Sequence, residues 1–279
     1  MKRVAALAAI AAVVLAACGG GGGKKTAANK TTTSVSDTST TVEGSTTTTG
    51  AAGATATTKK AATATTSAAK VNGQSASNYT PPAGATPAKP SPSGTYTYDN
   101  QATGTNTFGA PPAKSSLIVD PPQGTKQHST NDMGSSGKTE TTLDFRPEGV
   151  HLVEVKVTAQ GQSYDFTANP APLAAPTGVQ PGQSVTFDVS DAARNTSIHV
   201  QIDFVRMETI TIGGQPVNTM VIHQVGTLSG GLTGTQTMDA WVSPQYDLFV
   251  KTHSTGDVHS GVFEAKSDVT STLEKPTPN

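Results

Sequence analysis

The feature that most constrains the fold is an alternation of apolar and polar residues in the C-terminal third of the chain. Between residues 198 and 204 every second side chain is apolar, and the pattern runs on to a Gly-Gly pair at 213–214. A period of two predicts a strand with one buried face, and the two glycines tolerate the positive φ angles of a tight hairpin turn. A second apolar run over 217–228 predicts the returning strand.

Similar short runs recur through the region 93–275. We expect strands over 94–98, 139–145, 150–159, 162–168, 183–189, 235–242, 248–255 and 262–273, with a proline-rich connection over 169–182. Glycine and proline separate these runs, and none has the spacing of an amphipathic helix. The pattern predicts an all-β domain, an antiparallel meander curled into an open or a closed barrel-like sheet, because strand twist accumulates across a long sheet. Alternation alone does not decide whether the sheet closes.

The chain before residue 93 has a different composition. Residues 24–92 are dominated by Thr, Ala, Ser, Gly and Pro, with Tyr79 as the only aromatic residue. Such a segment buries too little apolar surface to offset the entropy lost on ordering. We therefore expect residues 18–92 to be a disordered linker with a root-mean-square span of roughly 45–50 Å. Residues 276–279 are expected to be a short tail.

The N-terminus carries a targeting signal. Lys2 and Arg3 precede an uncharged apolar run of thirteen residues over 4–16, which is too short to span a bilayer. Leu15, Ala16, Ala17 and Cys18 follow the pattern Leu-small-small-Cys, which resembles a bacterial lipobox. The alternatives are an ordinary signal peptide and an uncleaved anchor.

The lipobox resemblance implies a location and a membrane partner. It implies cleavage of a signal peptide, residues 1–17, and a diacylglyceryl group on the Cys18 sulfur. Two acyl chains give stable membrane attachment where one does not. We therefore expect a protein anchored on the extracytoplasmic face of the cell membrane. Cys18 is also the only cysteine, so no internal disulfide forms.

Charge is distributed unevenly. Residues 24–92 carry seven basic and two acidic residues, a net of +5, whereas residues 93–279 carry ten basic and eighteen acidic residues, a net of −8. The linker lysines either attract anionic headgroups or keep the linker soluble. An acidic domain lacks the basic face that nucleic acid requires, so we expect no nucleic-acid partner.

Three segments of the domain carry a second resemblance. The segment 208–219, Trp241-Val242-Ser243-Pro244 and Leu248-Phe249-Val250-Lys251 resemble a repeated theme of envelope proteins of unknown function. These proteins are similar to lipoprotein-localisation factors and to lipid-carrying actinobacterial lipoproteins. The resemblance implies an unclosed β-barrel with a concave apolar face. Those carriers place helices across this face, and the present sequence predicts none.

The candidates for lining a ligand cleft are aromatic. Trp241, Phe249 and Phe204 lie on predicted strands or at their ends, where large apolar side chains line a concave face. The alternative for Trp241 is an ordinary core position, since a lone Trp on a strand is usually part of the core.

No motif predicts a catalytic, metal or cofactor site. Residues 132–139 come close to a phosphate-binding loop, but Asp132 replaces the first glycine and no helix follows, so we expect a polar turn. His253, Asp257 and His259 have the donor types of a zinc site, but an exposed hairpin end is the favoured interpretation. His199 and Asp203 share a strand face, where solvated surface is the simpler interpretation.

The leading functional hypothesis is a non-enzymatic cell-envelope lipoprotein without a cofactor. Its β domain would bind an apolar ligand, such as a lipid or an acyl chain, or another envelope component. One alternative is a surface interaction or structural module without a ligand pocket. Another is an envelope hydrolase or a metal-dependent enzyme.

Overall fold

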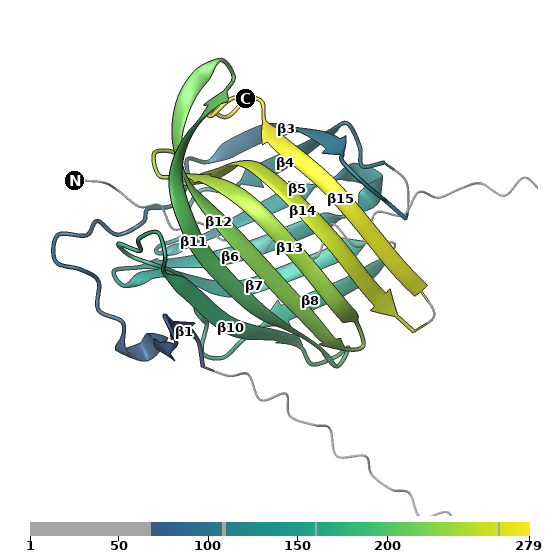
Figure 1. Cartoon of the computed structure of the whole chain (residues 1–279), viewed down its shortest axis with the longest axis horizontal. Helices are drawn as coiled ribbons and strands as arrows, with labels where there is room; N and C mark the ends of the chain where they lie inside the picture. The colour runs from purple at the N-terminus through teal and green to yellow at the C-terminus, as the bar shows by residue number, and fades with distance from the viewer. Residues whose placement is uncertain (1–67, 108–109, 160, 262) are drawn as a thin grey trace, which may run out of the picture. The chain divides into compact units, whose positions relative to one another are not determined.

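The computed structural model describes residues 68–107, 110–159, 161–261 and 263–279. The lipobox with Cys18, and the expected linker as far as residue 67, lie outside the described residues. Figure 1 shows a domain built of long antiparallel strands. In chain order the elements are β1 (Lys70–Val71), β2 (Gln74–Ser75), η1 (Ala76–Asn78), β3 (Gly94–Ala102), β4 (Lys114–Val119), β5 (Lys126–Asp132), η2 (Gly134–Ser136), β6 (Lys138–Arg146), β7 (Gly149–Ala159), β8 (Gln162–Thr167), β9 (Leu173–Pro176), β10 (Ser184–Asp191), β11 (Thr196–Ile212), β12 (Gln215–Gly230), β13 (Thr233–Ser243), β14 (Leu248–Ser260) and β15 (Phe263–Leu273).

The sheet closes into a barrel of 12 antiparallel strands. The ring runs from β3 to β8 in chain order, continues with β10 to β15, and returns to β3 where Leu273 lies opposite Tyr98. Between β8 and β10 the ring joins at Ser190 and Thr167. The all-β prediction is confirmed, and the sheet is closed rather than open.

Two short strands complete the barrel next to this join. β9 pairs with the start of β7, where Ala175 lies opposite Val150. β1 pairs with the start of β10, where Val71 lies opposite Val185. The proline-rich connection over 169–182 therefore contains a strand whose residues are buried, which its composition did not reveal.

The ordered part of the domain begins before residue 93, where the sequence placed the end of the linker. Val71 is buried in the main core, the Tyr79 hydroxyl donates to the Thr177 carbonyl at 2.7 Å, and the Ser91 amide donates to Gln127 Oε1 at 2.8 Å. These contacts correct the expected linker over 68–92. The physical reason is that single side chains of this segment contact the barrel, and isolated contacts leave no periodic pattern in the sequence.

The register shows which residues face inward, because directly opposite residues on antiparallel strands project to the same face. One such row crosses half of the barrel and contains Phe204, Ile222, Ala240, Thr252, Ser271 and Asn100. The neighbouring row on the outer face contains Asp203, His223, Asp239 and His253. β-Bulges after Thr142, Phe204 and Trp241 shift this alternation locally.

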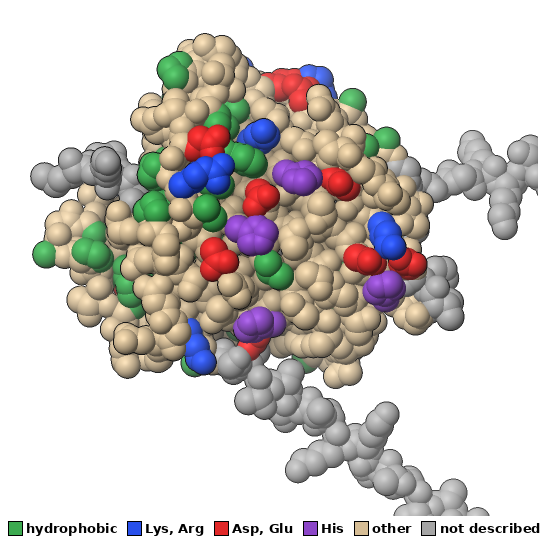
Figure 2. Space-filling view, viewed as in Figure 1, with side chains coloured by type: hydrophobic (Ala, Val, Ile, Leu, Met, Phe, Trp, Pro, Cys, Tyr) green, Lys and Arg blue, Asp and Glu red, His purple; other side chains and the backbone are tan. Residues whose placement is uncertain are grey.

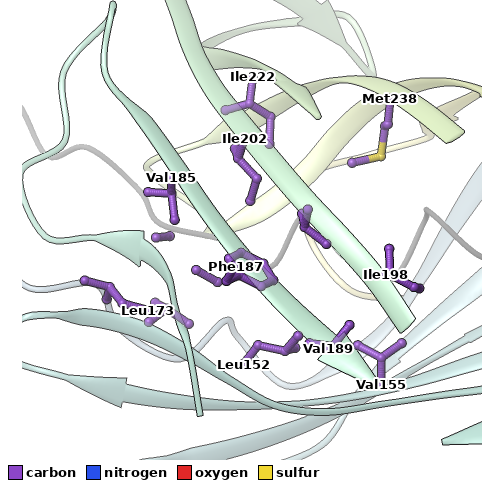
Figure 3. Close-up of a cluster of buried hydrophobic side chains, with 14 of the residues drawn as sticks. Leu152, Val155, Leu173, Val185, Phe187, Val189, Ile198, Ile202, Ile222 and Met238 are labelled. Atoms are coloured by element: carbon purple, nitrogen blue, oxygen red, sulfur yellow. The ribbon is translucent and has the colours of Figure 1, made fainter. Parts of the chain in front are cut away.

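The main core lies on the inward face of β7 to β13. Figure 3 shows its side chains converging from several strands, among them Leu152, Val155, Val185, Phe187, Val189, Ile198, Ile202, Ile222 and Met238, together with Leu173 of β9. Burial of large apolar side chains is the main term that stabilises such a fold.

A second cluster lies at one end of the barrel. The β11–β12 hairpin is longer than its neighbours, and it contributes Ile212 and Val217 to a cluster with Tyr96, Tyr98 and Leu273. After β15 the C-terminal residues run beside β3, where the Asn279 amide donates to the Thr95 carbonyl at 2.8 Å. In Figure 1 the hairpin rises at the same end of the barrel as the C-terminus.

Candidate functional site

The inward face of the barrel has two chemically different halves. From β7 to β11 it is almost wholly apolar, and Val155, Val157, Phe166, Val185 and Val200 are all 0% exposed. This half is filled by its own side chains. The buried Asp191 ends the inward row of β10, where its carboxylate accepts hydrogen bonds from the Asp165 and Arg194 amides.

From β12 through β15 and on to β6 many inward positions are polar. We call this set the polar wall, and it consists of Gln224, Gln236, Thr252, Ser254, Ser267, Ser271, Asn100, Ser115, Ser129, Asn131, Thr139 and Thr141. Apolar residues such as Leu117, Met238 and Val269 lie between its members. No charged side chain occurs in the inward rows of these strands within the described chain.

Several polar atoms of the wall are buried without a hydrogen-bond partner in the described part of the chain. They are both amide atoms of Gln224 and of Gln236, and the hydroxyls of Thr139, Thr141 and Ser267. Gln224 is 0% and Gln236 1% exposed. Leaving a buried polar group unpaired costs about 1–3 kcal/mol, and folded proteins contain few such groups.

Strands from opposite parts of the ring carry these atoms, and Gln224 and Ser267 lie on β12 and β15, the strands near β13. Gln236 lies on β13, whereas Thr139 and Thr141 lie on β6, on the far side of the strand order. In Figure 1 β13 crosses in front of β6. The unpartnered groups therefore come from two facing walls of the barrel.

Glycine bares the backbone on both sides of Gln236. Its directly opposite neighbours are Gly226 on β12 and Gly256 on β14. A Cβ atom placed on Gly256 would lie 2.9 Å from Ser267 Oγ and 3.7 Å from Gln236 Nε2. The Ser267 hydroxyl and the Gln236 side chain thus fill the space over Gly256.

The three aromatic residues suggested for a ligand cleft do not share one surface. Phe204 and Phe249 belong to inward rows, opposite Ile222 and Val242. Trp241 belongs to an outward row, between Val221 and Lys251. The Lys251 ammonium lies 4.7 Å from the ring centroid of Trp241, a cation–π contact.

The histidines lie away from the polar wall and each contacts a carboxylate. His223 Nδ1 lies 2.7 Å from Asp239 Oδ1, and His199 Nδ1 lies 2.7 Å from Asp188 Oδ1. Figure 2 shows histidines beside acidic side chains on the face formed by β11 to β15. Asp203, expected beside His199, accepts instead from Gln201 Nε2 at 3.0 Å.

The suggested zinc ligands also separate into pairs. His259 Nε2 lies 3.1 Å from Asp257 Oδ1, whereas His253 Nε2 lies 2.9 Å from Asp268 Oδ1. Within the described residues no group of three or more His, Cys, Asp or Glu side chains is placed to hold a metal ion. Hydrogen bonds from Thr103 and then His253 lower the pKa of Asp268.

The segment that resembles a phosphate-binding loop is a turn between β5 and β6. The Gly134 amide donates to Asp132 Oδ1 at 2.7 Å, and Gly134–Ser136 forms the 3-10 turn η2. The carboxylate of Asp132 thereby occupies an amide that an anion would need. Among the described helical turns, none has the length and hydropathy to cross a membrane.

Comparison with known proteins gave weak structural likenesses. No family model and no curated protein sequence matches the chain. Among solved structures, it is similar to the hypothetical lipoprotein YmcC from Escherichia coli, at 15% identity and a TM-score of 0.36 over 67% of this chain and 86% of that chain. It is also similar to a "putative lipoprotein" from Parabacteroides distasonis, at 13% identity and a TM-score of 0.33 over 67% of this chain and 96% of that chain.

Proposed function

We propose that the chain is a lipid-anchored protein of the cell envelope that binds a ligand inside its barrel and catalyses no reaction. The anchor is Cys18, preceded by the lipobox residues Leu15, Ala16 and Ala17. Residues 18–67 would act as the tether that holds the barrel away from the extracytoplasmic face of the membrane. The sequence of the signal region supports this location.

The observation that carries the binding role is the set of unpartnered polar atoms on the polar wall. Gln224 and Gln236 each bury a whole amide group without a hydrogen-bond partner in the described chain. Two buried amides of this kind cost several kcal/mol in total unless something pairs with them. A ligand that enters the polar half of the barrel would supply those partners.

The apolar half gives less support to an acyl-chain ligand. Its inward residues Val155, Phe166 and Val200 have no exposed surface, so an acyl chain would have to displace them. Close-packed cores resist such insertion. Gln224 and Gln236 are buried as deeply, but Thr252 and Ser271 on the polar wall are only half-buried, so we place the ligand against the polar wall, where the two amides would have to turn toward it.

The absence of charge on the polar wall favours binding over catalysis. General acid–base catalysis needs a titratable side chain within hydrogen-bond reach of the reacting group. Within the described chain, the inward rows of β12 to β15 and β3 to β6 provide amides and hydroxyls instead. The histidines, which are the usual bases, lie on the outer face in contact with carboxylates.

The experiment uses the full chain expressed in a bacterium, with membrane fractionation followed by native mass spectrometry of the detergent-purified protein. We expect the wild-type protein in the membrane fraction with the added mass of a diacylglyceryl group, and Cys18→Ser in the soluble fraction. We also expect a bound small molecule, or an increase in Tm with at least one added polar or apolar probe. An unmodified Cys18 would contradict the anchor, and failure of every probe to bind would contradict the binding role.

A further inference from the structure

We infer that the polar wall recognises an uncharged ligand that carries several hydroxyl groups, such as a neutral saccharide or a polyol. This inference rests on the proposed binding role and specifies the chemistry of the ligand. It goes beyond the sequence-based hypothesis, which favoured an apolar ligand.

The polar wall carries no charge to pair with a charged ligand. A charged ligand inside the barrel would lose its hydration and would need an opposite charge in return. In the described chain the polar wall offers only amide and hydroxyl groups, and acidic residues such as Asp239 and Asp268 lie on the outer rows. An uncharged ligand avoids this desolvation cost.

The amides and hydroxyls of the polar wall both donate and accept hydrogen bonds. A glutamine amide donates two hydrogen bonds and accepts others, and each Ser or Thr hydroxyl both donates and accepts. Ligand hydroxyl groups have the same dual capacity, so they can satisfy Gln224, Gln236 and Ser267 at the same time. An alkyl chain at this position would leave all of these atoms unpaired.

The Gln236 amide and the Ser267 hydroxyl lie together over Gly256. Gln236 Nε2 and Ser267 Oγ both lie near the position that a Cβ of Gly256 would occupy. Gly226 leaves the backbone bare on the other side of Gln236. Because the Ser267 and Gln236 side chains already fill the space over Gly256, a ligand at this point would meet the hydroxyl and the amide side by side rather than the backbone.

Part of the polar wall is accessible to solvent. Asn100, Ser115 and Ser254 on the polar wall keep about a twelfth of their surface exposed, at 8% each, although they face inward. Thr252 and Ser271 are more exposed still, being only half-buried. Solvent therefore reaches these members of the polar wall, whereas Gln224 and Gln236 are at most 1% exposed and meet a ligand only when the side chains that cover them move.

The test measures binding of neutral saccharides to the full chain. Maltose, cellobiose and trehalose are titrated by calorimetry and by thermal shift, with glucuronate as a charged probe and palmitate as an apolar probe. We expect at least one neutral saccharide to bind and glucuronate and palmitate not to bind. Gln236→Leu and Gly256→Ala should each weaken that binding by about tenfold or more.

Gln201→Leu is the matched control, because Gln201 lies on the outer face of β11 and is exposed. It should bind the saccharide as the wild type does, and circular dichroism of each variant shows whether it is folded. Palmitate binding without saccharide binding would overturn the ligand class and leave the proposed binding role intact. Failure of all probes would overturn both, and saccharide binding unchanged in folded Gln236→Leu and Gly256→Ala would overturn the assigned site.

Discussion

On the inner face of the barrel, Gln236 of β13 lies directly opposite Gly256 of β14, so that a buried amide stands beside bare backbone. An amide at such a position normally hydrogen bonds to a neighbouring side chain, and here the opposite residue has none. This relationship links the stability of the free protein to its proposed function.

The unpaired amide should make the ligand-free protein less stable than a variant with an apolar side chain of similar volume. Leucine has no polar atom to bury unpaired, so Gln236→Leu should raise the free energy of unfolding by about 1 kcal/mol. Urea denaturation measures this change. Gln201→Leu should change stability by less than about 0.5 kcal/mol. A clear loss of stability in Gln236→Leu would mean that the amide has a partner in the free protein.

Trp241 should take no part in ligand binding, because its row faces outward. Trp241→Phe should therefore bind a saccharide with the wild-type affinity, and it should lose about 0.5–1 kcal/mol of stability through the weaker cation–π contact with Lys251 and the lost packing against the second cluster. Calorimetric titration and urea denaturation of this variant give the two values. A large loss of affinity in a folded Trp241→Phe protein would return Trp241 to the binding site.

The segment that pairs β1 with β10 should stabilise the barrel. Val71 is 6% exposed and packs in the main core, so Val71→Ala should lower the free energy of unfolding by about 1–3 kcal/mol. Its exposed neighbour provides the control, and Lys70→Ala should have little effect. Equal stability of both variants would indicate that the packing of β1 contributes nothing to the fold.

Acid should weaken the contact that Thr103, in the turn after β3, makes with Asp268 of β15. The hydrogen bond from Thr103 is the main reason that the pKa of Asp268 lies below its usual value. A carboxyl group whose pKa is lower in the folded state stabilises the protein above its unfolded-state pKa, and this contribution is lost as the pH falls through the folded-state pKa. Removing the hydroxyl with Thr103→Val should thus reduce stability at neutral pH and flatten the fall in stability below about pH 4. Unfolding curves measured across this range give the slope of the free energy of unfolding against pH. The same slope in Thr103→Val as in the wild type would argue against the contact between Thr103 and Asp268.

Much of the fold could be predicted because apolar side chains mark one face of each long strand. The alternation in Ile198, Val200 and Ile202 correctly indicated β11, and the Gly213-Gly214 pair correctly indicated the turn into β12. Barrel closure depends on which distant strands pair, such as β15 with β3, and alternation contains no information about that pairing.

The polar wall also explains why the sequence did not reveal β5. In β5 the inward residues are Gln127, Ser129 and Asn131, so polar residues occupy both faces and no alternation exists. The same chemistry that forms the candidate site removes the strand signal. In hindsight a clue was present in β13, where Gln236 occupies a position in phase with Met238 and Ala240.

The central claim is that the buried amides of the polar wall receive an uncharged, hydroxyl-rich ligand. Its most direct test follows the side-chain NH₂ signals of Gln224 and Gln236 by NMR during a saccharide titration of the full chain, with Gln201 as the outer-face reference. We expect the two inner signals to shift with saturation while the Gln201 signal stays in place. Saturable binding that moves Gln201 but neither inner amide, or inner signals that stay unmoved by every neutral saccharide, would contradict the claim.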